Sequence, residues 1–545
     1  MDYPWLKFYE PGVPHQIDIP DWILPQLLDR SVQSPEKTAI IYFGKEISYF
    51  HLYNLVNRFT AGLQNCGIQK GDRVILALPN IPQLIIAYWA VLKIGAIAVL
   101  VNPLLSGSEL EYQIHACGAK TAVFWDRNLK KYHPDTVKDL ELIIAAGVET
   151  YMPFFMNMAF QIKKAFEEVK KQSRLPQKVL LFRELLSGHS PNVHAPLPLP
   201  DDPAVILFTG GVTGTPKPAV LSHRNLIANM LQAKSWITDF REGEVIVGAL
   251  PLIHSYGMTA CNHLAVGTKS TLLLYPRFQI KHIVDDMIKF NSGVFPGVPT
   301  MYAAILEEVK RRELESLPIR ICISGGAPLP VSLQNNFEKI TGAHLVEGFG
   351  LTEASPVTHC NPIRGINKKN SIGIPWPNTE ARIVDRKTGT ELETNKIGEL
   401  QIRGPQVMQS YWQDAGGGSD VKDADGWLRT GDFAYKDTDG YFYIADRIKD
   451  VIFYGGESIY PSEIEKLLSR HPHIREAAVI GVVDDYYGQV IKALVVQDGT
   501  GTVSENEVIR YCSEHLAKFK VPRYVEFVEK LPKNYLGKVL KRQLS

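Results

Sequence analysis

Apolar residues in the first quarter of the chain recur either with helical spacing or in short uninterrupted runs. Five of them fall on one helical face, at Leu52, Leu55, Val56, Phe59 and Leu63. The run 74–78 is apolar throughout and is stopped by a proline, which predicts a short buried strand. The same reasoning gives a helix, a strand, a helix and a strand over 82–94, 96–101, 107–117 and 122–124. Strands that alternate with helices in this way predict a parallel sheet with helices on both faces.

A further buried strand is expected over 204–208, and a glycine-rich segment begins at its C-terminal end. Ligands of open α/β sheets bind at that end of the strands, so this segment is a candidate binding loop. After the loop, Ser222 is placed to cap a helix over 223–236, because its hydroxyl can accept a hydrogen bond from the first helical turn.

The pattern changes in the last third of the chain. Residues 386–445 are rich in turns and alternate apolar with polar positions, which predicts a small β subdomain. Mixed α and β patterns return after residue 446. The predicted fold class is therefore α/β, with a large N-terminal domain of doubly wound sheets plus the small β subdomain, followed by a small α+β C-terminal domain. The expected domains are 1–446 and 447–545.

Length and charge limit the functional classes. A chain of 545 residues is too long for one ordinary core, so two or more domains are expected. Lys plus Arg number 59 and Asp plus Glu number 58, which gives a formal net charge of +1. This balance gives no sign of a nucleic-acid-binding surface, so we expect no nucleic acid partner. None of the six cysteines lies in a CxxC pair, so neither a zinc site nor a disulfide framework is expected.

The apolar stretch 84–101 could be mistaken for a membrane span. Lys93 and Gly95 interrupt it, and a spanning helix needs about 20 apolar residues, so a buried helix followed by a buried strand is the better interpretation. The N-terminus lacks the pattern of a signal peptide. Segment 151–174 carries apolar bulk followed by cations, which is typical either of a peripheral membrane contact or of a packed helix with a solvated basic end. We therefore expect a cytoplasmic protein, with peripheral membrane association left open.

The glycine-rich segment 209–217 has the composition of a phosphate-binding loop. Glycine has no Cβ, so several backbone N–H groups can converge on phosphate oxygens, and the segment adds hydroxyls and one cation. These candidates are Thr209, Gly210, Gly211, Thr213, Gly214, Thr215 and Lys217. Prolines flank Lys217, so this is not a Walker loop, and no GxGxxG fingerprint is present in this segment. Taken alone, the segment is explained equally well as a surface turn.

Four further segments follow this loop. They are Ser-Gly-Gly-Ala-Pro at 324–328, Gly-Phe-Gly-Leu-Thr-Glu at 348–353, Trp-Leu-Arg-Thr-Gly-Asp at 427–432 and Leu-Pro-Lys-Asn-Tyr-Leu-Gly-Lys at 531–538. In this order, the five segments resemble the signatures of the adenylate-forming superfamily of acyl-CoA synthetases, luciferases and peptide-synthetase adenylation domains. The chain is most similar to the long-chain fatty-acid–CoA ligases of that superfamily. The resemblance implies a reaction in which a carboxylate is joined to AMP and is then passed to a thiol.

The resemblance implies an ATP site that combines the loop with residues from the later segments. Those further ATP-binding residues are Gly326, Ala327, Pro328, Gly348, Phe349, Gly350, Asp432 and Arg447. Phe349 would stack on adenine. Asp432 would accept both ribose hydroxyls, since a carboxylate has two acceptor oxygens, and Arg447 would contact the ribose or a phosphate. Glu353 and Thr213 are the implied Mg²⁺ ligands, because this ion prefers oxygen donors.

Catalytic roles are implied for Lys538, His254 and Thr352. Negative charge builds up as the carboxylate attacks the α-phosphorus, and a cation there stabilises the transition state more than the ground state. Lys538, near the end of the chain and in the smaller domain, would supply that cation. Thr352 would contact the α-phosphate, and His254 would lie beside the acyl carboxylate.

The resemblance also places the other two substrates. His254, Tyr256 and Gly257 are the implied acyl-binding residues. Gly455 and Gly456 form the implied loop for coenzyme A, since glycines let a narrow pantetheine arm pass close to the backbone. Lys449 is the implied hinge about which a mobile C-terminal domain turns.

Three positions depart from the phosphate-loop signature. Gly210 replaces a serine, Val212 replaces a hydroxyl residue and Pro218 replaces a glycine.

We predict an acid–thiol ligase that joins a fatty acid, ATP and coenzyme A through an acyl-adenylate. The departures keep open a non-catalytic lipid- or nucleotide-binding relative, alongside an acyl-AMP ligase or an aryl-CoA ligase of the same fold. A luciferase-type monooxygenase is disfavoured, and the oligomeric state is open, with a homodimer among the alternatives.

Overall fold

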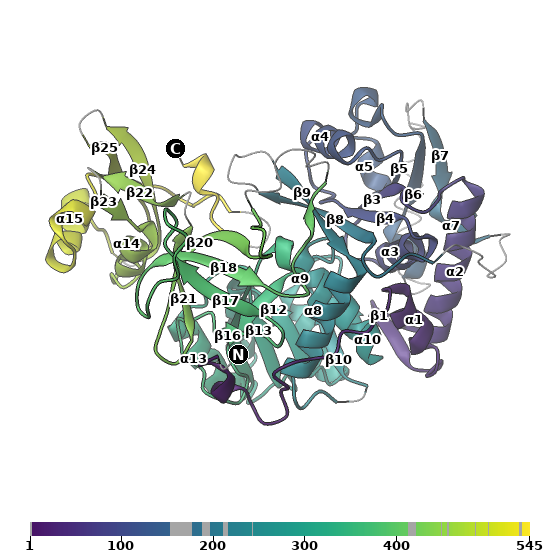
Figure 1. The fold of residues 1–545 in the computed structure, drawn as a ribbon, viewed down its shortest axis with the longest axis horizontal. Coiled ribbons are helices and arrows are strands. Elements are labelled where there is room, and N and C mark those ends of the chain that lie inside the picture. The colour runs from purple at the N-terminus through teal and green to yellow at the C-terminus, as the bar shows by residue number, and fades with distance from the viewer. Residues whose placement is uncertain are drawn as a thin grey trace.

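The computed structural model describes residues 3–152, 177–187, 197–210, 216–241, 243–412, 421–447, 450–454, 457–484, 487–499, 501–533 and 537–544. Within these residues the strands form four sheets. Figure 1 shows the C-terminal sheet with its helices to one side of a larger body that holds the other three. Most of segment 151–174 lies outside the described residues, so both interpretations of that segment stay predictions.

One sheet has eight strands in the order β19-β9-β8-β4-β3-β5-β6-β7. Their bounds are β3 Arg73–Ala77, β4 Ile97–Leu100, β5 Thr121–Trp125, β6 Leu142–Ala146, β7 Lys178–Leu181, β8 Pro203–Gly210, β9 Pro216–Ser222 and β19 Ser410–Tyr411. The strands from β8 to β7 are parallel, as the sequence pattern predicts. At this edge β9 runs antiparallel to β8, and β19 runs antiparallel to β9, so the phosphate-loop candidate joins two antiparallel strands.

A second sheet has nine strands in the order β16-β15-β14-β13-β12-β10-β11-β1-β2. Their bounds are β1 Thr38–Tyr42, β2 Lys45–Ser48, β10 Val245–Gly248, β11 Thr271–Leu274, β12 Val294–Gly297, β13 Ile321–Ser324, β14 His344–Gly350, β15 Val357–Cys360 and β16 Ile374–Pro375. The strands from β14 to β1 are parallel, and the flanking strands are antiparallel. The two doubly wound sheets confirm the predicted fold class.

The helices of the described residues lie around the sheets, and the last two of them pack beside the C-terminal sheet. Their bounds are α1 Pro25–Ser31, α2 Tyr49–Asn65, α3 Pro82–Ile94, α4 Gly107–Cys117, α5 Asp126–Leu129, α7 Phe182–Leu186, α8 His223–Trp236, α9 Ser255–Gly257, α10 Leu264–Thr268, α11 Ile280–Lys289, α12 Pro299–Arg311, α13 Val331–Thr341, α14 Pro461–Leu468 and α15 Glu505–His515. The hydroxyl of Ser222 accepts from the Asn225 N–H and caps α8, as the sequence predicts.

Helix α3 is apolar all round because it is enclosed by protein on all sides. Its residues are buried except Lys93, whose ammonium forms an ion pair with Asp29 at 2.7 Å. The helix ends at Gly95, which has φ of +81°, and β4 follows. The predicted buried helix and strand are therefore confirmed. In the part of the chain that the structure describes, every helix is too short or too polar to cross a membrane.

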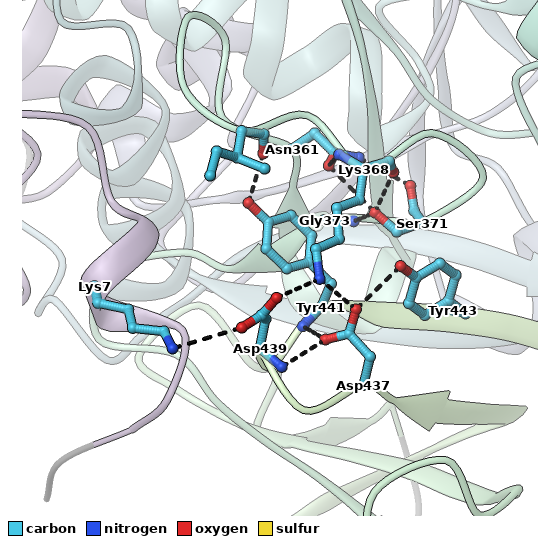
Figure 2. A network of polar contacts seen from close by, with 10 residues as sticks. Lys7, Asn361, Lys368, Ser371, Gly373, Asp437, Asp439, Tyr441 and Tyr443 are labelled. Atoms are coloured by element: carbon cyan, nitrogen blue, oxygen red, sulfur yellow. Dashed lines mark hydrogen bonds and ion pairs between the residues drawn. The ribbon is translucent and has the colours of Figure 1, made fainter.

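The predicted small β subdomain is a four-stranded antiparallel sheet in the order β17-β18-β20-β21. Its bounds are β17 Glu380–Val384, β18 Gly398–Arg403, β20 Leu428–Lys436 and β21 Phe442–Arg447. Figure 2 shows how the turn between β20 and β21 is fastened to the nine-stranded sheet. Lys368 Nζ lies 2.7 Å from Asp437 and 2.8 Å from Asp439, while Tyr443 donates its hydroxyl to Asp437 at 3.2 Å. Lys7 approaches Asp439 at 3.5 Å, so the N-terminal segment joins the same network.

The C-terminal sheet runs β23-β22-β25-β24, with β26 paired to β25. Its bounds are β22 Ile452–Tyr454, β23 Glu457–Ile459, β24 Ile474–Asp484, β25 Gly488–Gln497 and β26 Tyr524–Phe527. This part has its own apolar core, formed between the sheet and helices α14 and α15 by residues such as Ile464, Val479 and Val508. A separate core of this kind is expected of a unit that can move as one body.

Candidate active site

The phosphate-loop candidate is a hairpin between β8 and β9. Thr209 pairs with Lys217 and Gly210 pairs with Pro216, so both ends of the loop are fixed by a strand ladder. Tyr112 on α4 donates its hydroxyl to the Pro216 carbonyl at 3.0 Å and braces the second end. The Thr209 hydroxyl oxygen is buried and has no hydrogen-bond partner among the described residues, which do not include 211–215. An unpaired buried hydroxyl is costly, and a phosphate oxygen would satisfy it.

The carboxylate of Glu353 lies close to this hairpin. Glu353 belongs to a short 3₁₀ turn, Thr352–Ala354, that follows β14. Tyr411 on β19 donates its hydroxyl to Glu353 Oε1 at 2.9 Å, and the Lys217 ammonium lies 5.2 Å from the centre of the Tyr411 ring. The structure therefore brings two predicted residues of opposite charge, Lys217 and Glu353, to the same tyrosine.

The end of β14 needs its glycines for packing. A Cβ on Gly350 would lie 2.2 Å from the Pro356 carbonyl oxygen, and one on Gly348 would lie 3.2 Å from Ile323. Phe349, between them, is partly buried and stands edge-to-face against His359 with ring centroids 6.2 Å apart. The glycines thus hold the strand close to its neighbours.

The segment around His254 meets the same turn. Ser255 Oγ and Thr352 Oγ1 are 3.5 Å apart, so the segment that carries the predicted acyl-binding residues adjoins the predicted α-phosphate residue. His254 Nδ1 accepts from the Tyr256 N–H at 3.2 Å, and burial lowers the pKa of His254 to about 4. The imidazole is therefore neutral near pH 7, with its hydrogen on Nε2.

Tyr256 and Gly257 tie this segment to the turn after β13. The Tyr256 hydroxyl donates to the Ile323 carbonyl at 2.6 Å, and its ring would lie 3.0 Å from a Cβ on Gly325. A Cβ on Gly257 would lie 2.3 Å from the Pro251 carbonyl oxygen, so this site requires glycine. The turn continues through Gly326, with φ of +78°, to half-buried Ala327 and exposed Pro328.

Asp432 and Arg447 face each other on neighbouring strands. They are register partners on β20 and β21, and Arg447 Nε lies 3.4 Å from Asp432 Oδ1. The Asp432 side chain is only 6% exposed, and its backbone N–H donates to the Thr430 hydroxyl at 3.1 Å. The Figure 2 network holds the far end of both strands, so this carboxylate moves with the large body.

The turn that carries Lys538 touches the large body. Gly537 has φ of +79°, and a Cβ there would lie 3.1 Å from the Thr300 side chain in the first turn of α12. A Cβ on Gly326 would likewise lie 3.7 Å from the side chain of Val298, the residue that precedes α12. The Gly537–Lys538 turn and the 324–328 turn therefore both lie at the N-terminal end of α12.

Two ion pairs hold the flanks of the Lys538 turn within its own domain. Lys533 lies 2.7 Å from Glu476, and Lys541 lies 2.8 Å from Glu465 on α14. Glu465 also accepts from the Val479 N–H at 2.7 Å. Ion pairs within the C-terminal domain thus hold the chain on both sides of the Lys538 turn.

The AMP-binding enzyme family model matches residues 28–412, and the model of the AMP-binding enzyme C-terminal domain matches residues 463–538. The chain belongs to the AMP-binding enzyme family. It is 38% identical over 547 residues to the long-chain-fatty-acid–CoA ligase of Bacillus subtilis (strain 168), covering 99% of this chain and 97% of that ligase.

Solved structures of related enzymes have the same fold. ATP-bound MatB from Rhodopseudomonas palustris is similar with a TM-score of 0.84 and 29% identity, covering 95% of this chain and 98% of MatB. o-Succinylbenzoate coenzyme A synthetase (MenE) from Bacillus subtilis, in complex with ATP and a magnesium ion, is similar with a TM-score of 0.76 and 26% identity. That match covers 95% of this chain and 98% of MenE.

Several predicted residues of this AMP-binding enzyme lie outside the described residues. They are Gly211, Thr213, Gly214, Thr215, Lys449, Gly455 and Gly456. Their roles in binding phosphate, magnesium and coenzyme A, and at the hinge, stay predictions.

The donors near Glu353 fit a Mg²⁺ ion. Within the described residues, no group of three or more His, Cys, Asp and Glu side chains could hold a metal. Mg²⁺ rarely takes an all-protein cage; it binds one or two carboxylates and fills its shell with water and phosphate oxygens. The single carboxylate of Glu353, held by Tyr411, matches that preference.

Sequence reasoning missed a cavity in the C-terminal part of this AMP-binding enzyme. Its volume is about 330 Å³, and its lining includes Tyr454, Tyr487, Lys518 and Arg523. The two tyrosine rings are stacked with centroids 4.3 Å apart. The alternating cations and aromatics of 518–524 were the available signal, but β22 and β25 had to be paired before the cavity could be seen.

Proposed function

We propose that this AMP-binding enzyme joins a long-chain fatty acid to coenzyme A through an acyl-adenylate, releasing AMP and pyrophosphate. The observation that carries the proposal is the position of the Gly537–Lys538 turn. It lies against α12, at the end of the helix where the 324–328 turn also lies. The 38% identity to a long-chain-fatty-acid–CoA ligase supports the choice of acid and thiol.

The nucleoside is held by the large domain. Phe349 offers an aromatic face for adenine beside backbone kept close by Gly348 and Gly350. Asp432 offers two carboxylate oxygens to the ribose hydroxyls, and its ion pair with Arg447 fixes their direction. The Phe349 and Asp432 contacts both belong to the large domain, so neither depends on rotation of the smaller domain.

The triphosphate is held by the β8–β9 hairpin. The Thr209 hydroxyl needs a partner that a phosphate oxygen can supply, and Lys217 supplies a positive charge on the facing strand. Glu353 would hold Mg²⁺, which neutralises the charge of the leaving pyrophosphate when it is bound. We assign the Thr352 hydroxyl, which lies 3.5 Å from that of Ser255, to contact with the α-phosphate.

The fatty carboxylate is placed by His254. Because burial keeps the His254 ring neutral, its Nε2–H can donate a hydrogen bond to the carboxylate without neutralising the nucleophile. Lys538 then stabilises the charge that accumulates on the phosphorus oxygens as that carboxylate attacks. Gly257 and the Gly325 turn keep the backbone close to Tyr256, which we assign to acyl binding.

The second step requires the smaller domain to turn. We assign the domains as 1–446 and 447–545, with Lys449 as the hinge, because β21 ends at Arg447 and the C-terminal core begins at Ile452. The rotation would withdraw Lys538 and bring the loop with Gly455 and Gly456 to the acyl-adenylate. Tyr454 immediately precedes that loop, so the aromatic and cationic cavity next to it suits the nucleotide part of coenzyme A.

Replacing Arg523 with alanine should raise the KM for coenzyme A by roughly 10-fold, the effect of losing one charge-assisted contact of about 1.5 kcal/mol. Fatty-acid-dependent ATP–pyrophosphate exchange should stay unchanged, because the cavity serves only the second step. Arg475→Ala is the matched control: this arginine lies in the same domain and donates to the Glu529 carbonyl at 3.5 Å. Steady-state kinetics with varied coenzyme A check the prediction, and an equal rise in the KM for ATP would contradict it.

The proposed function is tested with a panel of fatty acids of increasing chain length. AMP formation should require a fatty acid, increase with coenzyme A and be greatest with long chains. Mass spectrometry should detect the acyl-CoA product. An acyl-AMP ligase would form the adenylate but no thioester, an aryl-CoA ligase would prefer aromatic acids, and a non-catalytic relative would bind ATP without releasing pyrophosphate.

A further inference from the structure

Tyr411 lies between two charged side chains that sequence reasoning assigned to the triphosphate, but it had no assigned role itself. Its hydroxyl donates to Glu353 Oε1 at 2.9 Å. Its ring centre lies 5.2 Å from Lys217 Nζ, within the range of a cation–π contact. Within the described part of the chain, the Tyr411 bond is the one hydrogen bond that the Glu353 carboxylate accepts.

The strand register explains why one tyrosine reaches both groups. Tyr411 pairs directly with Ala219 on β9, and Lys217 is two residues before Ala219. Side chains two positions apart on a strand share a face, so Lys217 and Tyr411 are diagonal neighbours across the β9–β19 ladder. Trp412 extends this attachment, because its N–H donates to the Pro218 carbonyl at 2.8 Å.

The segment before Tyr411 also holds the backbone of Glu353. The Met408 N–H donates to the Glu353 carbonyl oxygen at 2.7 Å. Residues 408–412 therefore contact the hairpin on one side and the 3₁₀ turn of Glu353 on the other. The relative position of Lys217 and Glu353 depends on this short segment.

We propose that Tyr411 is a positioning residue that aims the Glu353 carboxylate at the metal ion of the bound nucleotide and holds Lys217 over the same phosphates. The proposal rests on the proposed function for the identity of the nucleotide. A carboxylate that gives one oxygen to a tyrosine hydroxyl has its orientation fixed and keeps the other oxygen for the metal. Groups that hold a metal ligand in this way strongly affect the affinity of the metal.

The test measures metal binding directly. Mn²⁺, as a stand-in for Mg²⁺, is titrated by calorimetry into the full-length protein saturated with a non-hydrolysable ATP analogue. Tyr411→Phe should weaken Mn²⁺ binding on the order of 10-fold, and should leave metal-free binding of the analogue unchanged because the ring remains. Tyr411→Leu should also weaken metal-free binding, by about 2- to 5-fold, because Lys217 loses the ring.

A double-mutant cycle separates positioning from a general loss of structure. In a Glu353→Gln background, Tyr411→Phe should cause no further loss of Mn²⁺ affinity, since the hydroxyl acts only through that carboxylate. Additive losses would overturn the proposal, and so would wild-type Mn²⁺ affinity in Tyr411→Phe. Tyr443→Phe is the matched control, because Tyr443 donates to the Asp437 carboxylate in the remote network of Figure 2 and should leave Mn²⁺ binding unchanged.

The Mn²⁺-binding experiment and the acyl-CoA experiment have independent outcomes. If the wild-type protein binds the analogue with Mn²⁺ but forms no acyl-CoA from any fatty acid, the proposed function fails and the role of Tyr411 is still measured. If acyl-CoA is formed and Tyr411→Phe leaves the Mn²⁺ affinity intact, the role of Tyr411 fails alone.

Discussion

Replacing Lys538 with alanine should lower fatty-acid-dependent ATP–pyrophosphate exchange by about 100- to 1,000-fold, the range found when a preorganised charge-stabilising donor is removed from an active site. The ammonium is needed when the carboxylate attacks the α-phosphorus, because negative charge develops there. Gly537 packs against Thr300 at the end of α12, so the lysine is carried to the large domain in the arrangement seen here. Isotope exchange measured with saturating ATP and fatty acid gives the result.

The same variant should still convert supplied acyl-adenylate to acyl-CoA, because that step requires the smaller domain in another orientation. Lys530→Ala is the matched control, since Lys530 is exposed and lies eight residues earlier in the chain. It should leave both half-reactions unchanged. If Lys538→Ala impairs both half-reactions equally, or neither, Lys538 does not have the proposed role.

Acidification should destabilise the large domain well before its surface carboxylates are protonated. Burial lowers the pKa of His223 and His254 to about 4, and that of His263 and His359 to about 3. The unfolded chain takes up these protons near pH 6.5, whereas the folded chain does not. The stability that the neutral rings contribute is therefore complete above pH 6.5 and is lost as the pH falls toward 4.

Buried carboxyls oppose this effect in the same pH window. Burial raises the pKa of Glu347 to about 8, so the folded state holds a proton that the unfolded state releases above about pH 4.5. Burial likewise raises the pKa of Asp286 and Glu399. The four imidazoles take up more protons on unfolding than these carboxyls release, so a net uptake remains and the unfolding free energy falls below pH 6.5, by about 1.4 kcal/mol per pH unit for each net proton.

Urea unfolding at pH 6.5, 5.5 and 4.5 measures this slope. His359→Asn should reduce it by about one proton, or about 1.4 kcal/mol per pH unit, because one titrating group is removed. A stability that rises on acidification, or a slope unaffected by the substitution, would contradict the assignment of neutral buried histidines.

Local patterns were enough to predict several elements of this fold. Helix α3 was predicted from its apolar composition and the glycine that interrupts the apolar run after it, and α8 from the serine that caps it. The resemblance then located the residues of the site along the chain. Of these, Lys217, Glu353, Thr352 and His254 lie on segments that the structure brings together.

Features that depend on distant pairing could not be predicted. β19 is two residues long and pairs with a strand about 190 positions earlier, so nothing near Tyr411 indicates its contact with Lys217. The cavity beside Tyr454 likewise joins three separate segments. The placement of Gly537 against α12 depends on how two independently packed bodies meet, and the periodicity of neither body encodes it.

The ladder between Asp432 and Arg447 ends β21, two residues before the proposed hinge at Lys449. In any rotation, points near the fulcrum travel least and points far from it sweep the widest arc. The ribose site would therefore stay almost still while the amine of Lys538 moves away. Two different faces of the C-terminal domain would then reach the same bound adenylate in turn, and the adenylate would not leave its site.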